Sequence, residues 1–212
     1  MKRKTSISGI AAAIVTVMLI GCVASPYDQE KRGEWRWDVK TLTDVNSDAV
    51  NIADVISSSI KKQRNLIAPD KLQYNTPRFG TEFHVYKLTG KLIQYKIETD
   101  GDIHLVISSV DNDSETMITE IPDATKSPAS GSKFVDYFKD AKDSLINILK
   151  RHPRHNHPDT LFWGVLYKPL KNDPIYLTIT GVGFFDKIDG SIVQAPNGRE
   201  LHPVLGIEET KP

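Results

Sequence analysis

The chain has 212 residues, with 27 basic and 27 acidic side chains and a single cysteine. This balance excludes a protein built around a strong phosphate-binding field, so nucleic acid is not an expected partner. One cysteine cannot form an internal disulfide or a site of several thiolates, and stability is expected to come from packing.

The N-terminal segment has the order of a targeting signal. Three basic residues, 2–4, precede an apolar stretch over residues 10–20, which is shorter than the roughly 20 residues that span a bilayer. The stretch ends in Leu19-Ile20-Gly21-Cys22 and resembles a bacterial lipoprotein signal with its lipobox. The resemblance implies cleavage before Cys22 and acylation of that cysteine, and more than one acyl chain gives stable membrane anchoring. An ordinary signal peptide or an uncleaved anchor helix is the alternative.

The same reading divides the chain. We predict a signal peptide at residues 1–21, a lipid anchor and tether at 22–40, a helix and loop at 41–80, and an OB-like barrel domain at 81–209. The mature chain would carry 24 basic and 27 acidic residues, because the signal holds three basic residues and no acidic one. It is expected to be extracytoplasmic. In a Gram-negative cell, Val23 after the lipidated cysteine favours the periplasmic face of the outer membrane.

The first predicted element of the body is a helix. Residues 44–62 carry Ala49, Ala53, Ile56 and Ile60 at helical spacing. Residues 68–80 contain two prolines and a glycine and are expected to form a loop.

From residue 82 the apolar period changes to two, which predicts strands at residues 85–97, 103–110 and 117–121. The apolar phase of the first strand shifts across Gly90, which predicts a β-bulge there. The Asp100-Gly101 pair predicts a tight hairpin turn between the first two strands.

A helix with one apolar face is predicted over residues 132–150. A basic loop at 151–159 follows, which is expected to be solvated and, as the alternative, to contact phosphates of lipid or polysaccharide. An envelope protein or a polysaccharide is a possible partner of the chain. Strands are predicted at 175–185 and 201–207, with a shorter apolar strand at 161–166.

Three meandering strands, a helix and two further strands is the element order of an OB-fold, a five-stranded and partly open barrel. We therefore predict a mainly β protein with α: an OB-like five-stranded barrel with a helix between strands three and four, plus an N-terminal helix. Another small α+β sheet is the alternative.

Residues 83–207 resemble an uncharacterised group of bacterial secreted proteins. The resemblance is carried by the strings at residues 100–105, 120–123, 180–186 and 195–203. That group implies no particular activity.

Residues 92–123 also resemble, more weakly, the start of the staphylococcal-nuclease family, an OB-fold that cleaves phosphodiesters with Ca²⁺. Asp100-Gly101-Asp102 matches its turn, and Glu120 and Asp123 lie near its other carboxylates. The family's phosphate-binding arginines have no counterpart at residues 115–116 or in the strand at 175–185. Phosphoryl transfer depends on such cations, so the resemblance implies a related fold without useful nuclease activity.

Five polar residues form the candidate site. Asp102 and His104 share one face of the second strand, Glu200 and His202 share one face of the last strand, and Glu120 lies on the third. A cluster of histidines and carboxylates can hold Zn²⁺ or perform acid–base chemistry. The alternative is that both histidines are structural. No cofactor is expected other than a possible divalent metal ion.

Together these features predict a lipid-anchored extracytoplasmic binding protein of unknown ligand, with the membrane as a partner through Cys22. Binding is predicted in preference to catalysis. Two alternatives stay open: a metal-dependent hydrolase that uses the His/carboxylate cluster, and a structural component of the cell envelope.

Overall fold

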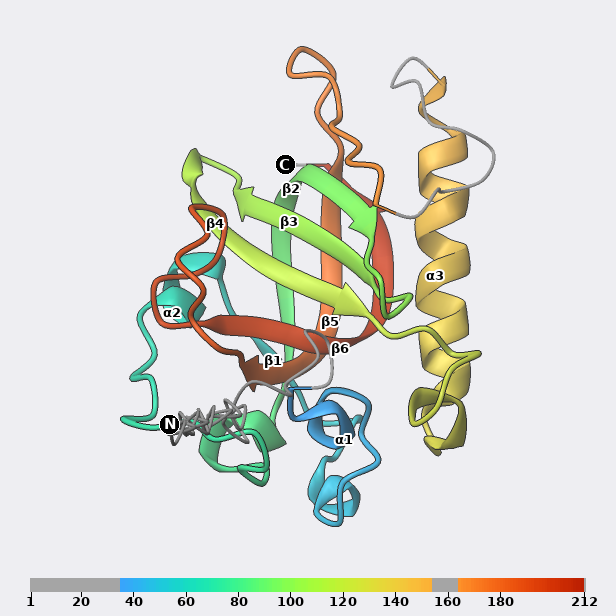
Figure 1. Cartoon of the computed structure of the whole chain (residues 1–212). Helices are drawn as coiled ribbons and strands as arrows, with labels where there is room; N and C mark the ends of the chain where they lie inside the picture. The colour runs from blue at the N-terminus through green and yellow to red at the C-terminus, as the bar shows by residue number, and fades with distance from the viewer. Residues whose placement is uncertain (1–34, 154–163, 212) are drawn as a thin grey trace, which may run out of the picture. The chain divides into compact units, whose positions relative to one another are not determined.

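The computed structural model describes residues 35–153 and 164–211, which are coloured in Figure 1. The lipobox with Cys22, most of the predicted tether and the first half of the strand predicted at 161–166 lie outside the described residues. The described part is mainly β, with one mixed six-stranded sheet and few helices. Within it, no helix has the length and apolarity needed to cross a membrane.

The sheet follows the order β1-β2-β3-β4-β6-β5, and β2 also pairs with β5. Its antiparallel pairs join β2 to β3, β3 to β4, β5 to β6 and β2 to β5, whereas β1 with β2 and β4 with β6 run parallel. The strands are β1 (Val55–Ser57), β2 (Val85–Ile97), β3 (Ile103–Ser109), β4 (Asn112–Ile121), β5 (Tyr176–Phe185) and β6 (Arg199–Thr210).

Strand β2 is long enough to pair with β3 and β5 along different halves, and its first residues also pair with β1. Its first half pairs with β5 and its second half with β3. The predicted bulge is displaced: the register shift lies between Leu92 and Gln94, because the buried side chains keep one parity through Leu92 and resume at Tyr95. Gly90 instead permits close packing, since a Cβ there would lie 2.8 Å from the Ser108 carbonyl oxygen.

Helix α3 (Val135–Lys150) lies beside the strands and packs mainly against β6 (Figure 1). The predicted apolar face is buried except at Tyr137, which is 43% exposed. The shorter helices are α1 (Trp37–Lys40) and α2 (Ile60–Arg64), and the 3-10 helices are η2 (Ser47–Ala49), η3 (Gly80–Phe83) and η4 (Ala129–Gly131).

The helix predicted at residues 44–62 is wrong. That segment contains η2, the edge strand β1 and the start of α2. Of the expected stripe, Ala49 and Ala53 are exposed and Ile60 alone is buried, so a helix would gain little from packing. The Asn51 side chain accepts a hydrogen bond from the Ala53 backbone, a local turn that competes with helix formation.

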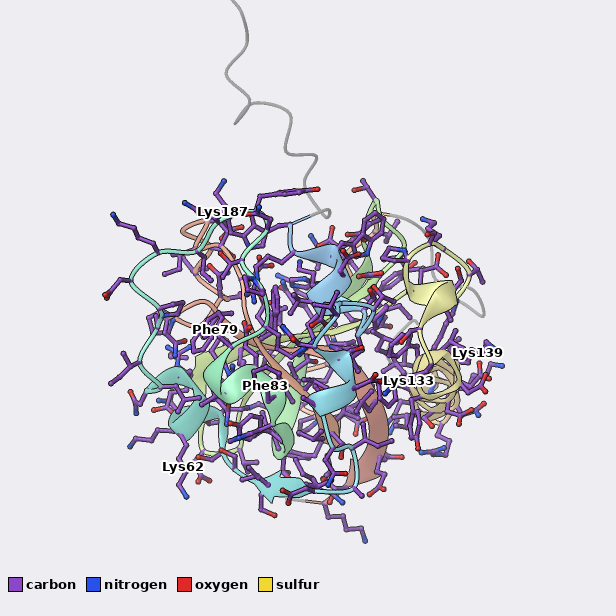
Figure 2. The ribbon with its side chains drawn as sticks, turned by 90° about the horizontal axis from the view of Figure 1, so that it is seen from below. Lys62, Phe79, Phe83, Lys133, Lys139 and Lys187 are labelled. Carbon is purple, nitrogen blue, oxygen red and sulfur yellow. The ribbon has the colours of Figure 1, made fainter. Side chains whose placement is uncertain are left out.

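A buried ion pair ties the segment before α1 to the end of β5. Both terminal nitrogens of Arg36 donate to the carboxylate of Glu82, at 2.8 and 2.6 Å, and Glu82 also accepts a hydrogen bond from the Phe185 backbone. The Phe79 ring stacks on the Phe185 ring with centroids 6.1 Å apart. Figure 2 views this side, with Phe79 and Phe83 near the middle. These contacts hold the end of β5 against η3.

Candidate metal centre

The outer part of the site is built on the β3–β4 hairpin. His104 and Glu120 are direct cross-strand partners in this antiparallel pair. Their side chains therefore project to the same face, and a 2.7 Å hydrogen bond joins His104 Nδ1 to Glu120 Oε1.

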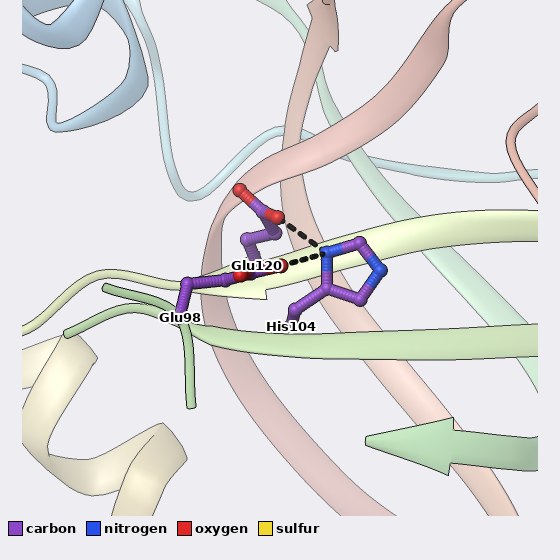
Figure 3. A group of neighbouring side chains, drawn as sticks. All are labelled: Glu98, His104 and Glu120. Atoms are coloured by element: carbon purple, nitrogen blue, oxygen red, sulfur yellow. Dashed lines mark hydrogen bonds and ion pairs between the residues drawn. The ribbon is translucent and has the colours of Figure 1, made fainter. Parts of the chain in front are cut away.

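The turn between β2 and β3 adds a second carboxylate. The Gly101 backbone donates to the Glu98 carbonyl oxygen, and Gly101 has φ of 97°, a conformation that glycine adopts without strain. The turn places Glu98 Oε1 3.5 Å from His104 Nδ1. Figure 3 shows this nitrogen facing both the Glu98 and the Glu120 carboxylates.

The inner part of the site comes from the parallel pairing of β4 with β6. The register that pairs Ile118 with Glu200 brings His202 beside Glu120. His202 Nδ1 lies 2.9 Å from Glu120 Oε2, and His202 Nε2 lies 3.4 Å from Asp102 Oδ2. The ring of Phe184 meets the imidazole edge-on, with centroids 5.8 Å apart.

Carboxylates and imidazoles therefore alternate through the site. Glu120 is the central member, because one of its oxygens faces His104 and the other faces His202. Asp102 ends the chain on the buried side and Glu98 ends it near the surface. The side chain of His202 is 0% exposed, that of Glu120 is 12% exposed and that of Glu98 is 31% exposed.

The inner histidine lacks satisfactory hydrogen bonds. Both ring nitrogens of His202 lie within ion-pair distance of a carboxylate, but neither makes a hydrogen bond of acceptable geometry with any described residue. Buried polar atoms in folded proteins nearly always have such a partner, so an exception calls for an explanation.

The electrostatics of the cluster favour the charged forms of Glu120 and His202. Burial lowers the pKa of His202, but the Asp102 and Glu120 carboxylates outweigh burial and raise it above its usual value of 6.5. Burial raises the pKa of Glu120, but His104 and His202 outweigh it and hold this pKa well below its usual range. The inner site therefore pairs an ionised carboxylate with a proton-binding imidazole.

A buried lysine lies next to the cluster. Lys40 Nζ is 3.0 Å from Asp186 Oδ2 and 5.4 Å from the centroid of the Phe184 ring. Burial lowers the pKa of Lys40, but the charges of Asp186, Glu120 and Glu200 outweigh it and raise the pKa above its usual value. Burial, followed by the charges of Asp186 and Glu120, raises the pKa of Glu200 well above its usual range. Glu200 therefore ionises less readily than Glu120.

Of the five sequence-predicted residues, the structure brings four together: Asp102, His104, Glu120 and His202. They belong to two groups of possible metal ligands, Glu98–His104–Glu120 and Asp102–Glu120–His202, each with donor atoms within 4.8 Å of one another. Glu200 belongs to neither group.

Sequence reasoning missed Glu98 and Lys40. Glu98 had a signal, because pairing across the Asp100-Gly101 turn sets it near Asp102, diagonal to His104. Lys40 had none, because its contact with Asp186 joins residues 146 apart in the chain.

The nuclease resemblance implies a Ca²⁺ site, and the types of donor atom in the cluster show whether Ca²⁺ would fit. Ca²⁺ takes oxygen ligands, whereas both groups here include an imidazole nitrogen. Mixed nitrogen and oxygen donors suit Zn²⁺ and other first-row transition metals. The cluster therefore fits Zn²⁺ better than Ca²⁺.

Three basic residues outside the cluster, Arg199, Arg151 and His152, are engaged in other contacts. Arg199 is fully buried, and its guanidinium donates to Gln63 and to the Thr81 carbonyl oxygen, so it is not free to hold a phosphate. Burial lowers the pKa of Arg199 to about 10. At the start of the predicted basic loop, Arg151 and His152 both pair with Glu209, and residues 154–163 lie outside the described residues.

No protein-family model, curated protein or solved structure matches this chain. The two sequence resemblances therefore stay predictions, and the functional argument depends on the geometry of the site.

Proposed function

We propose that this chain is a lipid-anchored, extracytoplasmic binding protein and that its ligand is a divalent transition-metal ion such as Zn²⁺. The observation that carries the proposal is the position of Glu120 between two histidines, His104 at 2.7 Å and His202 at 2.9 Å. A metal ion at this position would be bound by His202 Nδ1 and Glu120, while Asp102 Oδ2, 3.4 Å from Nε2, would orient the imidazole.

We propose an OB-like barrel as the scaffold. Strands β2, β3, β4, β6 and β5 each pair with two others of the five, and α3 lies between β4 and β5 in the chain. This is the connectivity expected for that fold. The barrel matters for the site, because it would hold β3, β4 and β6 at fixed spacing around Glu120.

Burial favours binding over hydrolysis. Asp102, Glu120 and His202 are all buried, whereas a hydrolytic substrate must reach the metal and the attacking water. A groove of about 890 Å³ lies between α3 and β6, and none of the cluster residues lines it. A metal-dependent hydrolase is therefore the second choice.

The proposed membrane anchoring and extracytoplasmic location are supported by the sequence alone. The lipobox ending in Cys22 is the basis for lipid anchoring and for an extracytoplasmic location, with the periplasmic face of the outer membrane expected in a Gram-negative cell. The same argument makes a binding role in the cell envelope the natural context for the metal site.

The proposal is tested by metal binding to the full chain in mild detergent. Metal-free protein is dialysed to equilibrium against buffered Zn²⁺ and, separately, against Ca²⁺, and bound metal is measured by mass spectrometry. We expect Zn²⁺ to bind and Ca²⁺ to be excluded. Glu120→Gln should weaken Zn²⁺ binding more than about 100-fold, because even partners of ligands are worth 10–100-fold. The matched control is Glu208→Gln on exposed β6 surface.

Two results would overturn the proposal. One is a wild-type chain that retains no Zn²⁺ at micromolar free metal. The other is equal binding by the wild type and by Glu120→Gln, with circular dichroism showing that both are folded.

A further inference from the structure

The two carboxylate oxygens of Glu120 face different histidines. Oε1 is 2.7 Å from His104 Nδ1, and Oε2 is 2.9 Å from His202 Nδ1. A carboxylate that directs its oxygens to two sets of donors has the arrangement of a bridging ligand. We infer that the cluster holds two divalent metal ions, bridged by Glu120; the inference depends on the metal-binding function proposed above.

Each position has its own donors besides the shared carboxylate. The outer group adds His104 and Glu98, and the inner group adds His202 and Asp102. At the outer position Glu98 and Glu120 both face His104 Nδ1, and this donor set fits a four-coordinate zinc ion with one further ligand. At the inner position Glu120 faces Nδ1 of His202 and Asp102 faces Nε2, so His202 and Glu120 would bind the ion and Asp102 would orient the imidazole through its other nitrogen. Glu120 is the one residue that the two positions share.

A second, independent observation supports the inner position. His202 is fully buried, and neither of its ring nitrogens has a hydrogen bond of acceptable geometry among the described residues. Each ring nitrogen faces one carboxylate, Glu120 at 2.9 Å and Asp102 at 3.4 Å, which suits an imidazole that binds metal through one nitrogen and is oriented by a carboxylate through the other.

The two positions differ in access. On the outer side the Glu98 side chain is 31% exposed, and Figure 3 shows its carboxylate beside His104. On the inner side His202 and Asp102 are buried. The outer ion should therefore be removed by a chelator within minutes, and the inner ion more slowly. This order gives the test a kinetic readout in addition to stoichiometry.

The experiment counts Zn²⁺ per full chain after dialysis and follows its removal by a chelator. The wild type should bind two ions that leave in two kinetic phases. His104→Ala and Glu98→Gln should each lose the fast phase and keep one ion, and Glu120→Gln should lose both. His84→Ala, at an exposed histidine of the η3–β2 connection, should behave as the wild type.

If substitutions at buried His202 prevent folding, His104→Ala and Glu98→Gln still test the inference, because they remove donors of the outer ion alone. One ion in the wild type, retained in full by His104→Ala, would overturn the bridged pair and leave the proposed function standing. One ion lost equally from His104→Ala and from a folded His202→Asn would show a single shared site and would also overturn it. No bound Zn²⁺ in the wild type would contradict the proposed function itself.

Discussion

Glu120 and His202 face each other at 2.9 Å across the parallel pair β4 and β6, although 82 positions separate them in the chain. Their approach depends on the crossover through α3, which carries the chain from β4 to β5 before β6 returns beside β4. The site can therefore form only when the strands are assembled. Because the metal ligands are brought together by folding, metal binding is expected to stabilise the folded chain.

The affinity for Zn²⁺ should rise with pH. The pKa of His202 is raised above 6.5 because the Asp102 and Glu120 carboxylates outweigh burial, so a proton competes with the metal at neutral pH. Binding must release this proton, and it becomes tighter as the pH rises through the raised pKa. Calorimetric titration at pH values between 6 and 8, in buffers of different ionisation enthalpy, measures both affinity and proton release. An affinity that stays constant over this range would be inconsistent with His202 as a ligand.

Gly183→Ala should destabilise the fold. A Cβ at Gly183 would overlap the guanidinium of Arg199, which is fully buried between Gln63 and the rings of Tyr86 and Phe185. We expect a loss of about 1–3 kcal/mol in the free energy of unfolding, the usual cost of overpacking. Urea denaturation measures this change.

Gly206→Ala is the matched control for that substitution. Gly206 lies in β6, and a Cβ there would meet no atom within 4 Å. Equal unfolding midpoints for the two variants would show that Gly183 is not required for packing around Arg199.

Phe138→Ala should cost about 3–5 kcal/mol of stability, because it removes a large side chain from a fully buried position. Phe138 belongs to the apolar cluster beneath the start of α3, together with Val182 and Leu205 from the strands. Tyr137→Ala changes the neighbouring, half-exposed aromatic residue and should cost much less. Thermal and chemical unfolding of the two variants compare these costs. An unchanged midpoint for Phe138→Ala would exclude this helix face from the core.

Cys22→Ser should block lipidation and leave an unprocessed precursor. The reason is the lipobox Leu19-Ile20-Gly21-Cys22, in which the cysteine thiol is the acylated group. Labelling of cells with a radioactive fatty acid, followed by electrophoresis, measures both acylation and precursor size. Equal labelling of wild type and variant would disprove the anchor.

Many of the strands could be predicted from sequence, because a strand with one buried face shows a local alternation of apolar and polar residues. Strand β2 has the predicted bounds, and α3 begins three residues after the predicted start. The bulge of β2 was misplaced because the phase shift between Leu88 and Ile93 fits either position in sequence. Only pairing with β3 shows that the extra residue follows Leu92.

The error at residues 44–62 has a different cause. Alanines at helical spacing look like a packing face, but a buried face requires large side chains and a partner surface. Here Val55 pairs with Val85, so an edge of the sheet, distant in sequence, determines the local structure.

The candidate site could be assembled only in part from sequence. Parity placed Asp102 with His104 and Glu200 with His202 on strand faces, but it could not show which member of each pair lies nearer Glu120. The antiparallel register of β3 with β4 sets His104 directly opposite Glu120, and the parallel register of β4 with β6 selects His202 over Glu200 as the ligand. That register is set by the whole sheet and leaves no local signal.

The most direct test of the metal centre is an anomalous difference map, recorded at the zinc absorption edge, from crystals of the Zn²⁺-loaded chain. We predict strong peaks on both sides of the Glu120 carboxylate, one beside His104 and one beside His202. A map without a peak at Glu120, or with peaks only at surface residues, would contradict the account.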